Sequence, residues 1–269
     1  MPLTLEHVTY TYPAGTKALR DLSFSVAPGE FVGLMGPTGC GKSTLLQIAA
    51  GILTPAEGTV HADGVTGMVF QNPDHQLFET TLEREIAFAP KCQKCSAEET
   101  ARRVTEALSA VGLDDPALRE RSPFTLSGGE KRRAVLAGVL AMEPTYLLLD
   151  EPLAGLDADS TEILLRCLDE RRRKGCAILM AAHDPDIICE YADRVIRVEE
   201  GRIVLDCPVR EAFSVKNNPG TALPELGHVR ECVVRLNAAG FSLSEDIATF
   251  AELTAALRAA LAERTGNHE

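Results

Sequence analysis

The sequence contains no tryptophan, few other aromatic residues and no long apolar run. Aromatic residues make up 5% of the 269 residues. A membrane-spanning helix needs about 18 uninterrupted apolar residues, and the best apolar runs, such as residues 176–182, are far shorter. The first seven residues lack the basic stretch followed by an apolar stretch that marks a secretory signal. We therefore expect a cytosolic chain that has no membrane span.

Positive charge is also scarce. The chain has 27 Lys and Arg residues against 39 Asp and Glu residues, so its net charge is 27 − 39 = −12 at pH 7. A protein that binds duplex nucleic acid normally carries a basic face, so we expect no nucleic-acid partner. Hydrophobic residues make up 45% of the chain. That content excludes intrinsic disorder, and the length predicts either one large domain or one large domain with a small appendage.

The eight cysteines do not indicate a disulfide framework, because the chain is long and has no secretion signal. Cys92 and Cys95 have the spacing of a metal or redox pair. A single CxxC with no second pair and no nearby histidine cannot complete a tetrahedral zinc site. Because these partners are missing, we expect plain reduced thiols rather than a metal or redox role.

The order of apolar patterns predicts an α/β fold with a largely parallel sheet. The first 35 residues form short strands broken by turns, residues 80–142 have helical periodicity, and strands and helices alternate from Tyr146 onward. An Asn-Asn-Pro-Gly sequence at 217–220 predicts a linker. Two helical stretches, 225–238 and 244–264, follow it. We expect one core domain and a small helical tail.

A phosphate-binding loop is predicted where an apolar strand meets a helix. Residues 36–43 satisfy GxxxxGK[ST], and backbone N–H groups of such a turn face a β-phosphate at the positive end of the helix. Lys42 would place its charge on the β- and γ-phosphates, and Ser43 would offer a hydroxyl to Mg²⁺. The alternative is a plain glycine-rich turn, which the strand–helix context disfavours. The predicted nucleotide-binding residues here are Gly36, Pro37, Thr38, Gly39, Cys40, Gly41, Lys42, Ser43 and Thr44.

Two carboxylates end a second apolar strand. Residues 146–149 are followed by Asp150 and Glu151, and open α/β sheets bind ligands at the carboxyl ends of their strands. Asp150 would hold Mg²⁺ through water, and Glu151 would face the γ-phosphate and polarise the attacking water. Because Asp-Glu also ends ordinary strands, this assignment depends on the phosphate-binding loop.

A third motif, Leu-Ser-Gly-Gly-Glu at 126–130, precedes a helical run at 131–142. Ser127 is a predicted N-cap, and the two glycines leave helix N–H groups available to an anion. A plain capping turn would use the same residues. The discriminating feature is the strand that ends in Asp150 and Glu151, 20 residues downstream.

The order of these three motifs resembles that of ABC-type ATPases, the nucleotide-binding subunits of ABC transporters, over residues 8–206. The resemblance implies a P-loop NTPase core with an N-terminal antiparallel β portion, a helical subdomain at about 72–142 and a small C-terminal helical extension. The ABC ATPase domain would span 1–214, and the extension would span 215–269. ATP and Mg²⁺ are the implied cofactors.

The resemblance also implies roles for residues outside the motifs. Tyr12, 24 residues before Gly36, matches the aromatic residue that stacks on adenine. Gln71 matches the lid glutamine that touches Mg²⁺ and the attacking water. His183, 32 residues after Glu151, matches the histidine that contacts the γ-phosphate. Without the resemblance, a strand-edge tyrosine and a surface histidine are the simpler interpretations.

The resemblance further implies a dimer. In this family, residues matching Ser127, Gly128 and Gly129 bind the γ-phosphate of ATP held by the other subunit. The acid of the loop that crosses the dimer interface matches Asp157. One cassette therefore could not complete a site.

A narrower resemblance surrounds Gln71. Residues 69–78, with support from 85–88 and 130–133, resemble the energy-coupling factor (ECF) transporter ATPases and the related cobalt-type importers. This implies the ATP-hydrolysing motor of a vitamin or transition-metal importer, peripheral at the cytoplasmic face of the membrane. Its partners would be a second ATPase subunit, identical or paralogous, an integral membrane coupling subunit and a substrate-capturing subunit. The alternative is a soluble single-cassette ABC ATPase acting in cofactor assembly.

The sequence does not decide the roles of two surface features. Glu79, Glu83 and Glu85 are either a solvated helix start or a docking surface for basic residues of a membrane partner. The extension 215–269 leaves room for a dimer-stabilising role, which its composition alone does not test.

Overall fold

The computed structural model describes residues 1–213 and 227–266. Its strands are β1 (Leu3–Thr11), β2 (Lys17–Val26), β3 (Phe31–Met35), β4 (Glu57–His61), β5 (Thr66–Val69), β6 (Tyr146–Asp150), β7 (Ala177–Ala181), β8 (Arg194–Glu199) and β9 (Arg202–Pro208). Its helices are α1 (Lys42–Ala49), α2 (Leu82–Cys92), α3 (Ala97–Ala110), α4 (Pro116–Arg119), α5 (Gly128–Leu140), α6 (Ala158–Arg173), α7 (Pro185–Tyr191), α8 (Val209–Ala212), α9 (His228–Ala238) and α10 (Phe250–Gly266). Two 3₁₀ turns are η1 (Pro73–His75) and η2 (Pro123–Thr125). The predicted linker at 217–220 lies outside the described residues.

The larger sheet confirms the predicted α/β fold. Its strand order is β5-β6-β7-β3-β8-β9, and all neighbours are parallel except β8 and β9, which form an antiparallel hairpin. Every residue of β6 and β7 is buried, as expected for strands that are covered on both faces. Because β7 lies between β3 and β6, the segments that follow these three strands meet at one edge of the sheet.

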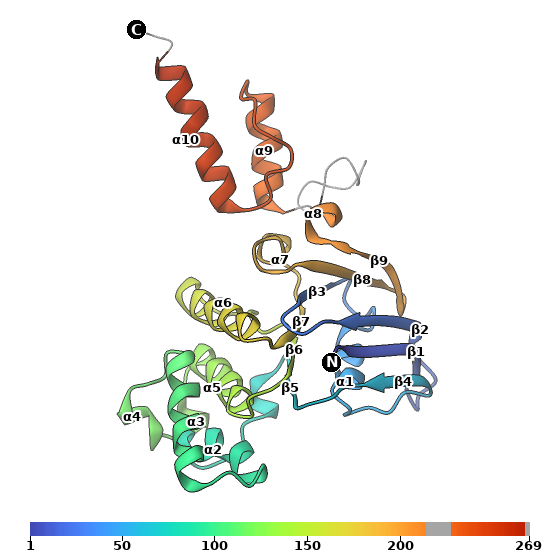
Figure 1. Cartoon of the computed structure of the whole chain (residues 1–269), viewed down its shortest axis with the longest axis vertical. Helices are drawn as coiled ribbons and strands as arrows, with labels where there is room; N and C mark the ends of the chain where they lie inside the picture. The colour runs from blue at the N-terminus through green and yellow to red at the C-terminus, as the bar shows by residue number, and fades with distance from the viewer. Residues whose placement is uncertain (214–226, 267–269) are drawn as a thin grey trace.

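A second sheet, β2-β1-β4, is antiparallel and lies on the right in Figure 1. Its apolar side chains share a core with β3 and α1, and Leu5, Val8, Val32 and Leu45 are fully buried there. This arrangement confirms the predicted N-terminal antiparallel portion. It places the end of β1 beside the helix that follows the phosphate-binding loop.

Helices α2, α3 and α5 pack together at the lower end of the molecule in Figure 1. Ile86, Leu108 and Leu136 are buried between them. At the surface, Arg102 makes ion pairs with Glu99 at 2.7 Å and with Glu143 at 2.8 Å, and so joins α3 to the residues after α5. The apolar contacts supply most of the stability, because exposed ion pairs contribute only about 0.2–1 kcal/mol each.

Two predicted helix starts differ from the structure, and capping explains both. Helix α5 begins at Gly128 rather than at residue 131, because Ser127 and Glu130 form a capping box that satisfies both backbone N–H groups. The predicted helix 244–264 was wrong at its start, since α10 begins at Phe250. There, the Thr249 hydroxyl accepts from the Glu252 N–H at 3.2 Å, and the Glu252 carboxylate accepts from the Thr249 N–H at 3.2 Å.

Helices α9 and α10 stand at the top of Figure 1, apart from the two sheets. They have their own apolar cluster, which includes Val233 and Leu253. Asp186, on α7, attaches this pair to the main body by accepting hydrogen bonds from the N–H groups of His228 at 2.8 Å and Val229 at 3.1 Å. A carboxylate at this position caps α9 and favours its positive end. In the described part of the chain, no helix has both the length and the hydropathy needed to cross a membrane.

Candidate active site

The phosphate-binding loop joins β3 to α1, as predicted, and its glycines are required by its backbone shape. Gly36 and Gly41 have φ values of 144° and 115°, in the region that favours glycine. A Cβ on Gly36 would lie 2.1 Å from the carbonyl oxygen of Val198. The Lys42 ammonium is buried and donates to the carbonyl oxygens of Gly36 at 2.7 Å and Pro37 at 3.2 Å. The loop therefore holds a cation at its centre.

Asp150 and Glu151 are consecutive but face different partners. Asp150 ends β6 and is 4% exposed. Burial raises the pKa of Asp150, and the Ser43 hydrogen bond and the Lys42 charge oppose that rise. Glu151 has a φ of 52°, a conformation that non-glycine residues rarely adopt. This turn separates the two carboxylates and gives each its own environment.

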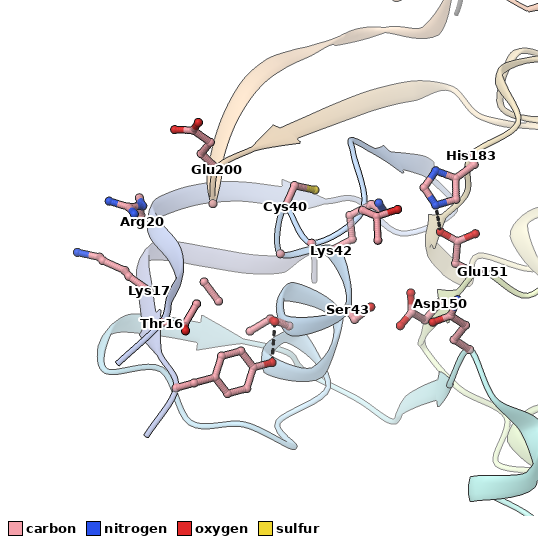
Figure 2. A pocket seen from close by; sticks show the side chains of 18 residues that line it. Thr16, Lys17, Arg20, Cys40, Lys42, Ser43, Asp150, Glu151, His183 and Glu200 are labelled. Atoms are coloured by element: carbon pink, nitrogen blue, oxygen red, sulfur yellow. Dashed lines mark hydrogen bonds and ion pairs between the residues drawn. The ribbon is translucent and has the colours of Figure 1, made fainter. Parts of the chain in front are cut away.

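The Glu151 carboxylate contacts His183, which follows β7. Its Oε1 lies 2.7 Å from His183 Nε2, and Figure 2 shows the two side chains pointing at each other. Burial raises the pKa of Glu151, and the charges of His183 and Lys42 oppose that rise. A carboxyl group with a raised pKa is better suited to accept a proton near neutral pH than an exposed one. His183 is thus not an unattached surface histidine.

One cavity of about 430 Å³ collects most of the predicted residues (Figure 2). The predicted residues that line it are Tyr12, Thr38, Gly39, Cys40, Gly41, Lys42, Ser43, Thr44, Gln71, Asp150, Glu151 and His183. Gly36 and Pro37 contribute to the site through their carbonyl groups, which accept from Lys42. These residues come from five separate segments of the chain.

The cavity also has lining residues that the motifs did not reveal. Lys17 and Arg20 come from β2, and Glu200 comes from the turn between β8 and β9. Figure 2 shows these three at the end of the cavity away from Glu151 and His183. Because β2 begins soon after Tyr12 in the sequence, Lys17 and Arg20 could have been expected near the cavity. Nothing in the sequence indicated Glu200, because its turn reaches the loop only in the folded chain, where the Gly201 N–H donates to Cys40 at 3.0 Å.

Tyr12 lies just beyond the end of β1 and lines the cavity. Its hydroxyl shares a hydrogen bond with the Thr44 hydroxyl at 2.8 Å, and its ring packs edge-on against Tyr10 at 5.0 Å between centroids. The side chain is therefore fixed against α1, next to the phosphate-binding loop.

Ser127, Gly128, Gly129 and Asp157 are not among the described residues that line this cavity. Ser127 and Gly128 are exposed at the N-terminus of α5. Asp157 caps α6, where its carboxylate accepts from the Ser160 N–H at 2.7 Å. The predicted site is thus divided between a cavity and an exposed helix start.

The acidic cluster is smaller than the sequence suggested. The Glu85 carboxylate is buried and accepts from the N–H groups of Phe78 at 2.9 Å and Glu79 at 2.8 Å. It therefore shapes the turn before α2 and is not available for docking.

All eight cysteines are free thiols, and the described residues hold no group of three His, Cys, Asp or Glu side chains that could bind a metal.

The fold and the cavity define an ATP-binding cassette, and comparisons with known proteins agree. The ABC transporter family model matches residues 19–154, half of the chain. The energy-coupling factor transporter ATP-binding protein EcfA2 of Symbiobacterium thermophilum is 41% identical, and the match covers 99% of each chain. The chain belongs to this family of energy-coupling factor transporter ATP-binding proteins and is an ABC-type ATPase.

Solved structures show the same fold. CbiO1 from Clostridium perfringens, described as part of the ABC transporter complex CbiONQ, has a TM-score of 0.73 and 34% identity, over 88% of this chain and 96% of that chain. An ATP-binding cassette solved as a dimer in a post-hydrolysis state with ADP and Pi has a TM-score of 0.70 and 28% identity. That match covers 77% of this chain and 98% of the other.

Proposed function

We propose that this chain is the ATP-hydrolysing motor of an ECF importer for a vitamin or a transition metal, working as a dimer at the cytoplasmic face of the membrane. The observation that carries the proposal is the contact between Glu151 and His183, 2.7 Å apart, in the cavity that Lys42 and Asp150 also line. A scaffold that only binds nucleotide has no need for a partly buried carboxylate with a raised pKa at this place.

Nucleotide binding is assigned to the loop and to Tyr12. The backbone N–H groups of the loop and the Lys42 ammonium would hold the β- and γ-phosphates. Tyr12 would stack on adenine, an interaction that contributes about 1–3 kcal/mol in comparable base–aromatic pairs. Glu200 and Lys17, at the same end of the cavity as Arg20, would lie near the nucleoside.

A Mg²⁺ ion fits the donor set of this cavity. Ser43, Gln71 and Asp150 all line this cavity, so oxygen ligands of the kind that Mg²⁺ prefers come together there. When bound, the ion would supply charge neutralisation at the β- and γ-phosphates. Burial raises the pKa of Asp150, and Lys42 and Ser43, which favour its ionised form, oppose that rise.

Hydrolysis is assigned to Glu151, Gln71 and His183. Glu151 would accept the proton of a water molecule as the water oxygen bonds to the γ-phosphorus and the bond to the leaving ADP oxygen breaks. Gln71 would orient that water, and His183 would contact the γ-phosphate.

The dimer follows from the residues outside the cavity. We assign Ser127, Gly128 and Gly129 to the γ-phosphate of ATP held by a second ATPase subunit, and Asp157 to the interface between the subunits. The exposed N-terminus of α5 supports this, and so does the cassette relative that was solved as a dimer. The extension 215–269, beyond the ABC domain 1–214, would stabilise this dimer.

A dilution experiment tests the dimer. Each subunit would lack the γ-phosphate donors of its partner when alone, and removal of such donors costs about 100-fold or more in turnover. We therefore expect ATP turnover per chain to fall by about that factor as dilution converts dimers to monomers, with light scattering to measure the mass. Undiminished turnover in a strictly monomeric preparation would contradict the assignment of Ser127 and Gly129.

The membrane partners can be tested by purification. Affinity-tagged chain, recovered from detergent-solubilised membranes, should bring with it an integral membrane protein in fixed stoichiometry, and ATP turnover should depend on that protein. A complex that contains only soluble proteins would instead favour the single-cassette assembly ATPase. Of the acidic cluster before and within α2, Glu79 and Glu83 are partly exposed and would be available for such docking.

A further inference from the structure

Arg132, on α5, bridges two segments that are far apart in the sequence. One terminal guanidinium nitrogen donates to the Glu151 carbonyl oxygen at 2.6 Å, and the other donates to the Gln71 carbonyl oxygen at 3.0 Å. Gln71 comes two residues after β5, and Glu151 comes directly after β6. These strands are neighbours in the sheet, so Arg132 closes the gap between their carboxyl ends.

The two bonds are strong ones. Arg132 is partly buried, and its burial lowers the pKa of the guanidinium while the Glu151 charge raises it. An arginine remains charged in such surroundings, so both carbonyls receive charge-assisted hydrogen bonds in a planar fork. Lysine and glutamine cannot reproduce that fork.

Each bonded segment needs an external support. Glu151 has a φ of 52°, and a non-glycine residue in that conformation persists only where its surroundings fix it. Gln71 precedes the short turn η1 rather than a long element. Next to Arg132, Lys131 makes an ion pair with Asp74 of η1 at 2.8 Å, so the start of α5 holds this segment at two points.

We propose that Arg132 is a positioning residue for hydrolysis, which sets Gln71 and Glu151 at a fixed separation by binding both of their carbonyl groups. This inference rests on the proposed catalytic roles of Gln71 and Glu151. Arg132 does not line the nucleotide cavity and would not touch ATP. It belongs to the helix that contains Gly129 and is capped by Ser127, so a shift of α5 would move both catalytic groups together.

Kinetics of Arg132→Gln, Arg132→Lys and the control Arg166→Gln test the proposal. Arg166 is exposed on α6 and contacts Glu162 one turn away. Loss of charge-assisted hydrogen bonds predicts a kcat at least about tenfold lower in both Arg132 variants. KM for ATP should stay within about threefold, because the phosphate-binding loop is unchanged. Arg166→Gln should match the unaltered protein.

The lysine variant separates geometry from charge. If Arg132→Lys restores kcat to within about threefold of the unaltered protein, a positive charge suffices and the proposal is overturned. Unchanged kcat in both Arg132 variants overturns it as well. Should Arg132→Gln fail to fold, Arg132→Lys still carries the test, since it keeps the charge and most of the side-chain volume.

Hydrogen–deuterium exchange supplies a readout that does not depend on catalysis. In the nucleotide-free protein, amides of residues 69–78 should exchange at least about threefold faster in Arg132→Gln and at the normal rate in Arg166→Gln. Normal exchange in Arg132→Gln overturns the bridge. Retained turnover in Glu151→Gln would instead refute the proposed catalytic base, so the two failures can be told apart.

Discussion

Glu151→Gln should still bind ATP but hydrolyse it at least about 100-fold more slowly than the unaltered protein. Glutamine has nearly the same size, so the cavity should keep its shape. Its amide cannot accept a proton from water, and loss of a general base typically costs between about 100-fold and 10,000-fold. Burial raises the pKa of Glu151, which would suit its carboxylate to accept a proton near neutral pH.

Single-turnover hydrolysis and equilibrium binding of labelled ATP measure the two effects separately. Glu98→Gln is the matched control, because it makes the same chemical change at a distance from the cavity. Glu98 is exposed on the first turn of α3. Its turnover should equal that of the unaltered protein. Normal turnover in Glu151→Gln would remove Glu151 as the base and return His183 or Gln71 to consideration.

Lys42→Met should weaken ATP binding by roughly 100-fold. Lys42 is 7% exposed, and its ammonium donates to the carbonyl oxygens of Gly36 and Pro37. It can exchange these partners for phosphate oxygens with little movement of the loop. Loss of charge-assisted hydrogen bonds worth about 3 kcal/mol corresponds to about a 100-fold change in Kd.

Calorimetric titration with ATP and with ADP tests this expectation. The loss should be larger for ATP, because Lys42 would contact the γ-phosphate that ADP lacks. Lys174→Met provides the control, since Lys174 is exposed at the end of α6 and far from the loop in sequence. Equal Kd values for ATP in Lys42→Met and in the unaltered protein would refute the assigned role.

Much of the fold was predictable because its signals are local. The apolar run of β3, the glycine pattern and the helical spacing after Gly41 lie within about 20 consecutive residues, so the strand–loop–helix unit needed no tertiary information. The strand that ends in Asp150 is equally local. The start of α10 was missed because Thr249, whose side chain caps the helix and sets its boundary, lies inside the predicted helical stretch.

The motifs by themselves determined which residues could bind phosphate and supply carboxylates, since those properties belong to residue types at fixed spacing. Only the tertiary structure decided their arrangement. It turned Glu151 away from Asp150 and onto His183, placed Glu200 and Lys17 in the same cavity, and buried Glu85 in a turn. It also brought Arg132 to the carbonyls of Gln71 and Glu151. The bond from Arg132 to Gln71 joins residues 61 positions apart. Such long-range contacts form only when the sheet sets its strand order, which no local pattern encodes.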